Sequence, residues 1–146
     1  MSVNVNLRSG KNQLIILDLM SKLCKYTFER TQKPVNKKDV EKSGDFPKEY
    51  RRLANQIWDT CYRADKYISL ANDYTVHSHE DYLERRKLQL LGRGEFKHLP
   101  RLIYLAYIMN VIDTHRYDTW LGLVDAVDGK LDNWIKENEE RFSNIG

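Results

Sequence analysis

The segment that decides the fold class is FPKEYRRLANQIWDTCYRADKYISLAND, residues 46–73. Its apolar residues recur alternately four and three positions apart, the spacing that lines one face of a helix with side chains for a bundle core. These residues are Tyr50, Ala54, Ile57, Cys61, Ala64, Ile68 and Ala71. Charged and polar residues fall on the opposite side, and Trp58 and Tyr62 lie on a flank, one turn apart. The pattern predicts a helix over residues 47–73.

The same periodicity predicts the first and the last helix of the chain. The first covers residues 11–32 and ends before Pro34, because a proline ring cannot continue a helix. The last covers residues 114–141 and carries an apolar stripe along its length, with Thr114 as the expected N-cap.

The remaining helix, third along the chain, is predicted over residues 78–112. Ser78 suits the N-cap, and two acidic residues follow in the first turn, where the helix dipole favours negative charge. Gly92, Gly94 and Pro100 interrupt the pattern, so we expect a bend or a local break just before Pro100.

Composition agrees with a single helical domain. The 146 residues are 41% hydrophobic and 31% charged, with only three Pro and seven Gly. Three connections shorter than the helices favour antiparallel neighbours, so we predict an all-α, up-down-up-down four-helix bundle over residues 1–146. No apolar signal region opens the chain, and the longest apolar run, Leu102 to Met109, is shorter than the roughly 20 residues that span a membrane. We therefore expect a cytoplasmic protein with no membrane partner.

Two apolar surfaces exceed what the core of a single bundle needs. Helix 78–112 ends in LIYLAYIMNVI, which is apolar nearly all round, and helix 114–141 carries small residues behind its stripe. Glycines inside a helix cost about 1 kcal/mol each, which the close approach of another backbone would offset. Either the N-terminal segment and the long loop cover these surfaces, or copies of the chain pack there. We predict a homo-oligomer whose interface contains Trp58, Tyr62, Leu105, Ile108, Ile112, Gly122, Ala126 and Gly129.

Basic residues gather in the third helix. Residues 83–101 carry a net charge of +4, whereas residues 113–146 carry −4. A run of charge is most simply a solvated helix face. Arginine suits bidentate phosphate contacts, however, and aromatic rings such as Phe96 offer surfaces for base stacking, which favours nucleic-acid or polymerase binding. The candidate residues are Arg52, Arg63, Lys66, Arg85, Arg86, Lys87, Arg93, Lys97 and Arg101.

No catalytic or metal-binding arrangement is evident in the sequence. Cys24 and Cys61 fall within the apolar periodicity and are expected to be reduced core thiols, with a disulfide or a catalytic thiol as the alternatives. His77 and His79 would point to different sides of a helix, so a helix-capping loop is favoured over a metal-dependent hydrolase site with Glu80. We predict a protein without catalytic residues, metal or cofactor.

Residues 46–73, together with LPRLIYLAYIMNVIDTHRYDTWLGLVDAVDGKLDNWIK at residues 99–136, resemble the Avd-like four-helix bundle proteins. These are the accessory variability determinants of diversity-generating retroelements, which are related to the 23S rRNA intervening-sequence proteins. The resemblance is carried by the Phe-Pro start of the second helix, the RLIYLAY core and the Gly-x-x-x-x-Trp-Ile pattern near the end. It covers roughly Lys11 to Lys136.

The resemblance implies a pentameric barrel of bundles that binds a reverse transcriptase, its template RNA and the cDNA. Such proteins support the error-prone cDNA synthesis that diversifies a target gene, and the polymerase does the chemistry. The net charge of +3 is mild for this role, so RNA binding is expected to need the polymerase alongside. The alternative is an intervening-sequence-type bundle with a structural or interaction role. A neighbouring reverse-transcriptase gene with a template and variable repeat pair would decide between them.

Overall fold

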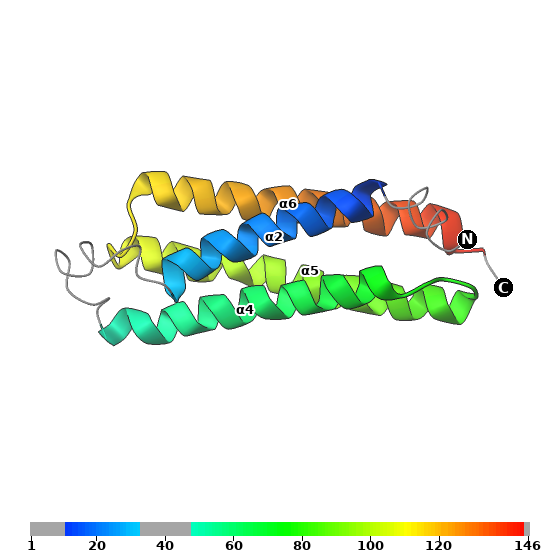
Figure 1. Cartoon of the computed structure of the whole chain (residues 1–146), viewed down its shortest axis with the longest axis horizontal. Coiled ribbons are helices and arrows are strands. Elements are labelled where there is room, and N and C mark those ends of the chain that lie inside the picture. Colours follow the sequence, from blue (N-terminus) through cyan, green and yellow to red (C-terminus); the bar gives the residue numbers. More distant parts are fainter. Residues whose placement is uncertain (1–10, 33–47, 145–146) are drawn as a thin grey trace.

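A computed structural model describes residues 11–32 and 48–144, which form four α-helices (Figure 1). The helices are α2 (Lys11–Thr31), α4 (Lys48–Asp73), α5 (His79–Ile108) and α6 (Thr114–Phe142). The predicted all-α four-helix bundle is therefore confirmed. Pro34 and the Phe-Pro pair expected to start the second helix lie outside the described residues.

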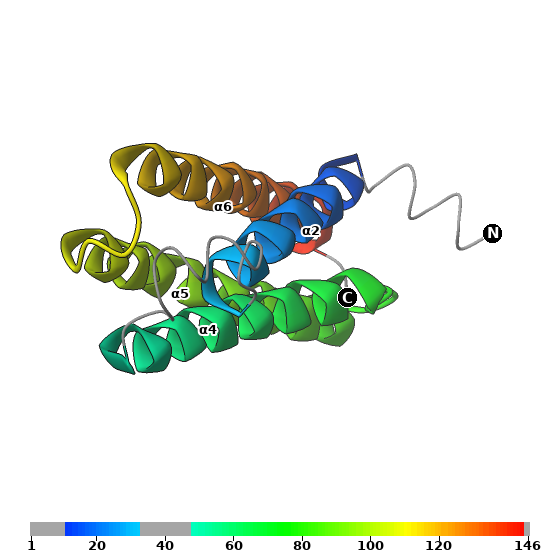
Figure 2. The same ribbon diagram turned by 60° about the vertical axis from the view of Figure 1, so that its left-hand side comes forward.

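Each helix packs against the next one along the chain, and α6 returns to pack against α2. Figures 1 and 2 show that successive helices run in opposite directions, so the bundle is up-down-up-down. Among the described helices, no backbone contact joins the diagonal pairs α2/α5 and α4/α6. Side chains from all four helices fill the space between those diagonals.

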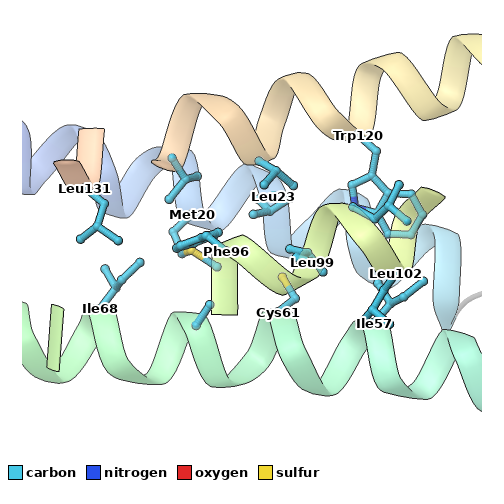
Figure 3. Close-up of a cluster of buried hydrophobic side chains, with 14 of the residues drawn as sticks. Met20, Leu23, Ile57, Cys61, Ile68, Phe96, Leu99, Leu102, Trp120 and Leu131 are labelled. Carbon is cyan, nitrogen blue, oxygen red and sulfur yellow. The ribbon is translucent and has the colours of Figure 1, made fainter. Parts of the chain in front are cut away.

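The core confirms the face predicted for α4. All seven residues of its seam are buried, and Ile57, Cys61 and Ile68 are completely inaccessible to solvent. Figure 3 shows these side chains pointing toward residues of the other helices, among them Phe96 of α5 and Trp120 of α6. Burying each large aliphatic side chain contributes about 1.5 to 3 kcal/mol, so this seam supplies much of the stability of the bundle.

Hydrogen bonds to side chains define the starts of α5 and α6. Ser78 caps α5 as predicted, since its hydroxyl accepts a hydrogen bond of 3.1 Å from the backbone N–H of Asp81. The cap of α6 is Asp113, whose carboxylate accepts from the backbone N–H of Arg116 at 2.8 Å. The prediction of Thr114 as this cap was therefore wrong by one residue. The same hydrogen bond lowers the pKa of the Asp113 carboxyl.

Of the bend or local break expected before Pro100, the break is absent, because α5 runs without interruption to Ile108. It ends four residues earlier than expected because Asn110 adopts a left-handed conformation with φ 61°. The N–H of Asn110 then donates to the carbonyl of Tyr107 at 3.0 Å, and the N–H of Val111 donates to that of Ala106 at 3.1 Å. These two bonds form a Schellman motif, which turns the chain toward α6.

Candidate interaction surfaces

The outer face of α5 carries most of the exposed apolar surface. Six of the nine large hydrophobic residues exposed in the described chain lie on it or at its C-cap. They are Leu83, Leu90, Leu91, Tyr104, Ile108 and Met109. Scattered apolar residues are normal at a protein surface, whereas clustered ones indicate an interaction site.

The first of these clusters, Leu83, Leu90 and Leu91, was missed by the sequence analysis. Together with Arg86 and Lys87, these leucines line a shallow groove of about 400 Å³. Their spacing along the helix was visible in the sequence. What could not be seen there is that α4 and α6 pack against the other side of α5 and leave this face open.

The second cluster lies at the C-terminal end of α5 and only partly matches the predicted interface. Ile108 is 49% exposed and Leu105 is half-buried, as an interface would require, but Ile112 is only 7% exposed and belongs to the core. Ile112 was predicted to be an outer residue of a longer helix, and the turn at Asn110 instead carries it inward. Nearby, the rings of Tyr107 and Tyr117 stack with their centroids 4.5 Å apart.

The small-residue strip of α6 lies on the surface. Gly122, Ala126 and Gly129 are all exposed. A Cβ atom added at Gly122 or at Gly129 would meet no heavy atom within 4 Å in the described chain. Packing among the described residues therefore does not explain these glycines. By contrast, a Cβ at Gly92 of α5 would lie 3.3 Å from Cγ1 of Ile68, so the close approach of α4 and α5 accounts for that residue.

Trp58 and Tyr62 form an aromatic cluster with Phe28 of α2. The ring centroids of Phe28 and Trp58 are 5.6 Å apart, and those of Trp58 and Tyr62 are 6.2 Å apart. Tyr62 is 58% exposed and Phe28 is 41% exposed. Phe28 was not predicted, because its place beside Trp58 depends on how α2 and α4 align.

Three of the nine candidate cations are held in ion pairs between helices. Arg63 pairs with Glu95 at 3.0 Å and Arg93 pairs with Asp132 at 3.4 Å. A third pair joins Arg86 to Glu139. Hydrogen bonds to the partner carboxylates raise the pKa of Arg63 and Arg86. These three arginines therefore hold helices together and are only partly available to a phosphate.

Arg85 is buried and does not lie on the surface with the other cations. It is 4% exposed, and its Nη1 donates to Oδ1 of Asn138 at 3.2 Å. Its Nη2 donates to the carbonyl of Tyr74, and its guanidinium lies 5.8 Å from the ring centroid of Trp134. Burial, followed by the charge of Arg141, lowers the pKa of Arg85. Phe96, expected to offer a stacking surface, is also buried at 2% exposure.

The other five candidate cations are exposed and form no ion pair with any residue that the structure describes. They are Arg52 and Lys66 on α4, and Lys87, Lys97 and Arg101 on α5. The three on α5 share the outer face with the exposed leucines. Arg101 also lies over the ring of Tyr104, 5.7 Å from its centroid. Five of the nine predicted cations therefore remain free of ion pairs within the described chain, and four do not.

No metal-binding group is present in the described part of the chain, where no three His, Cys, Asp or Glu residues come close enough to hold an ion. His79 instead lies against the ring of Tyr82, with centroids 5.9 Å apart. The two cysteines are free thiols. None of the described helices is long and apolar enough to cross a membrane. Comparisons with protein-family models, curated proteins and solved structures gave no match.

Proposed function

We propose that this protein is a non-enzymatic accessory factor of a diversity-generating retroelement, which assembles into a homo-oligomer and binds reverse transcriptase and template RNA. The chain itself would do no chemistry. The observation that carries the proposal is the outer face of α5, which combines exposed leucines with three unpaired cations. Apolar surface suits protein contacts, and unpaired cations suit phosphates. The resemblance to Avd-like bundles supplies the identity of the partners.

Self-association concentrates the charge that a single chain lacks. A net charge of +3 is weak for binding RNA, but copies arranged around one axis would present their free cations to the same strand. Linked sites bind far more tightly than separate ones, because later contacts become intramolecular. The proposal therefore requires the oligomer, for which a pentamer is the expected size.

Light scattering and sedimentation velocity test the oligomer. Leu90→Glu combined with Leu91→Glu should reduce the assembly, because it places charge in an apolar contact while leaving the core intact. Leu70→Glu is the matched control, since Leu70 is 44% exposed on α4. A wild-type protein that stays monomeric at high micromolar concentration would overturn the assembly.

Charge reversal tests the nucleic-acid contact. Lys97→Glu with Arg101→Glu should abolish RNA binding by the protein–polymerase complex, together with its cDNA synthesis. The matched control is Lys130→Glu with Lys136→Glu on α6, which changes net charge by the same amount. Wild-type binding should weaken with salt, with a log–log slope of about −0.7 per phosphate contacted. Equal cDNA yields from the two double variants would contradict the proposed role of α5.

A further inference from the structure

Cys24 of α2 and Cys61 of α4 face each other across the seam between these helices. Their sulfur atoms are 3.8 Å apart. The same two helices are joined further along this seam, where the Gln32 side chain donates a hydrogen bond of 3.0 Å to Asn55. A disulfide requires a sulfur–sulfur distance of about 2.05 Å, so the two atoms must approach by roughly 1.8 Å. Rotation of two side chains on adjacent helices can supply most of that movement.

The two thiols differ in exposure and in proton affinity. Cys61 is completely buried, whereas Cys24 is half-buried and can be reached from the surface. The hydrogen bond between the sulfurs lowers the pKa of Cys61, and a hydrogen bond with Thr27 lowers it further. The same contact between the sulfurs, followed by burial, raises the pKa of Cys24. The first proton therefore leaves from Cys61, and the second stays on Cys24 in the hydrogen bond between the two sulfurs.

We propose that Cys24 and Cys61 are a modification site, at which a small disulfide oxidant converts the two thiols into a reversible disulfide that links α2 to α4. Transfer of the remaining proton from Cys24 to Cys61 through their hydrogen bond leaves a Cys24 thiolate, which can be reached from the surface and attacks one sulfur of the oxidant. This forms a mixed disulfide and releases one small thiolate. The Cys61 sulfur then attacks the Cys24 sulfur and displaces the second small thiolate. The two protein protons pass to the two released thiolates, so the products are one protein disulfide and two small thiols.

The bridge would join the helices directly beside the aromatic cluster of Phe28, Trp58 and Tyr62. Phe28 lies one turn beyond Cys24 on α2, and Trp58 lies one turn before Cys61 on α4. Oxidation would thus fix the separation of the two helices at this exposed cluster. This inference uses only the geometry of α2 and α4 and is independent of the proposed function.

Mass spectrometry of the full chain after incubation with oxidised glutathione tests the proposal. The wild type should lose two hydrogens in its native state and retain no glutathione. Cys61→Ala should instead accumulate one glutathione on Cys24, because no second thiol can resolve the adduct. Cys24→Ala should react slowly, because Cys61 is buried. The proposal is overturned if the native wild type keeps bound glutathione, stays fully reduced, or forms only intermolecular dimers.

Thermal unfolding of the wild type, oxidised and reduced, gives a second readout that does not require the single variants to fold. A disulfide between Cys24 and Cys61 closes the chain between these residues into a loop, which restricts the unfolded state. It should raise the melting temperature of the oxidised wild type by roughly 10 °C, and a reductant should reverse the change. The double variant Cys24→Ala/Cys61→Ala should show the same melting temperature with oxidant and with reductant. A bridge that forms only in denaturant, or one that leaves the melting temperature unchanged, would contradict a native disulfide.

Discussion

Trp120 and Trp134 lie on the same face of α6, about four turns apart, and both side chains are completely buried. Their indole N–H groups differ in hydrogen bonding. Nε1 of Trp120 donates a hydrogen bond of 3.0 Å to the hydroxyl of Thr27 on α2. Nε1 of Trp134 has no hydrogen-bond partner among the described residues.

The surroundings of the two tryptophans differ in the same way. Beside Trp134 lie Arg85, Gln89 and Asn138, all buried. Nε of Arg85 and Oε1 of Gln89 also lack hydrogen-bond partners in the part of the chain that the structure describes. Each unsatisfied buried polar atom costs about 1 to 3 kcal/mol. Arg85 adds the desolvation of a cation that forms no ion pair with any described carboxylate. The Trp134 half of the core is therefore the less favourable half and should open first.

The largest expected effect comes from removing the one side-chain acceptor that Arg85 has among the described residues. Asn138→Leu should destabilise the protein by about 3 kcal/mol, because it leaves a buried guanidinium with only the Tyr74 carbonyl. Urea unfolding measures this cost. Adding Arg85→Met should recover much of the loss, since an apolar pair replaces the buried charge. If Asn138→Leu costs less than about 1 kcal/mol, Arg85 is not held as the structure shows.

Replacing each tryptophan by phenylalanine compares the two halves directly. Both changes remove ring volume from the core, but only Trp120→Phe breaks a hydrogen bond and leaves the Thr27 hydroxyl without its donor. Trp120→Phe should therefore cost about 1 to 2 kcal/mol more than Trp134→Phe. Chemical unfolding of the two variants measures the difference. Equal costs would show that buried polar groups are satisfied equally well in the two halves.

The glycines on the outer face of α6 test whether the two halves also differ at the surface. Gly122→Ala near Trp120 and Gly129→Ala near Trp134 should each stabilise the isolated bundle by about 1 kcal/mol, because both positions are helical and open. If this strip is an oligomer interface, the same changes should also weaken assembly in light scattering. A loss of stability in the monomer would contradict the open surface at the substituted position.

The sequence predicted the inner face of α4 correctly because one helix's periodicity determines its own buried side. It failed for Arg85, which was expected at the surface but, like Gln89, continues the alternating spacing of the buried residues of α5. Their residue types suggested the surface, and their spacing, which placed them in the core, was the better guide. The leucines at positions 83, 90 and 91 show the converse, since they lie off that spacing and are exposed.

Other features depend on how helices align with one another, which a single sequence does not show. Lys97 and Arg101 were correctly identified as exposed cations. Arg63, Arg86 and Arg93 form ion pairs with residues on other helices. The sequence alone therefore could not show that these three arginines are not free. The early end of α5 had a local signal in Asn110, because asparagine tolerates the left-handed conformation.

The smallest expected effect concerns Asp65 of α4, a half-buried carboxylate in the Trp120 half. Its charge acts on the nearby Cys61 thiol. Burial raises the pKa of this carboxyl above its ordinary value of 3.8. The folded protein therefore keeps the proton to a higher pH than the unfolded chain does. The charged form opposes folding at neutral pH, and this cost disappears as the pH falls through the raised pKa.

Asp65→Asn should accordingly stabilise the protein at pH 7 by about 0.5 kcal/mol, a figure kept small because solvent screens the half-exposed group. At a pH below 3.8 the substitution should change little, because the carboxyl is then neutral in both states. Urea unfolding at both pH values measures the contrast, and Asp59→Asn, an exposed change on the same helix, serves as the control. Destabilisation at pH 7 would mean that the Asp65 charge has a favourable partner in the folded protein.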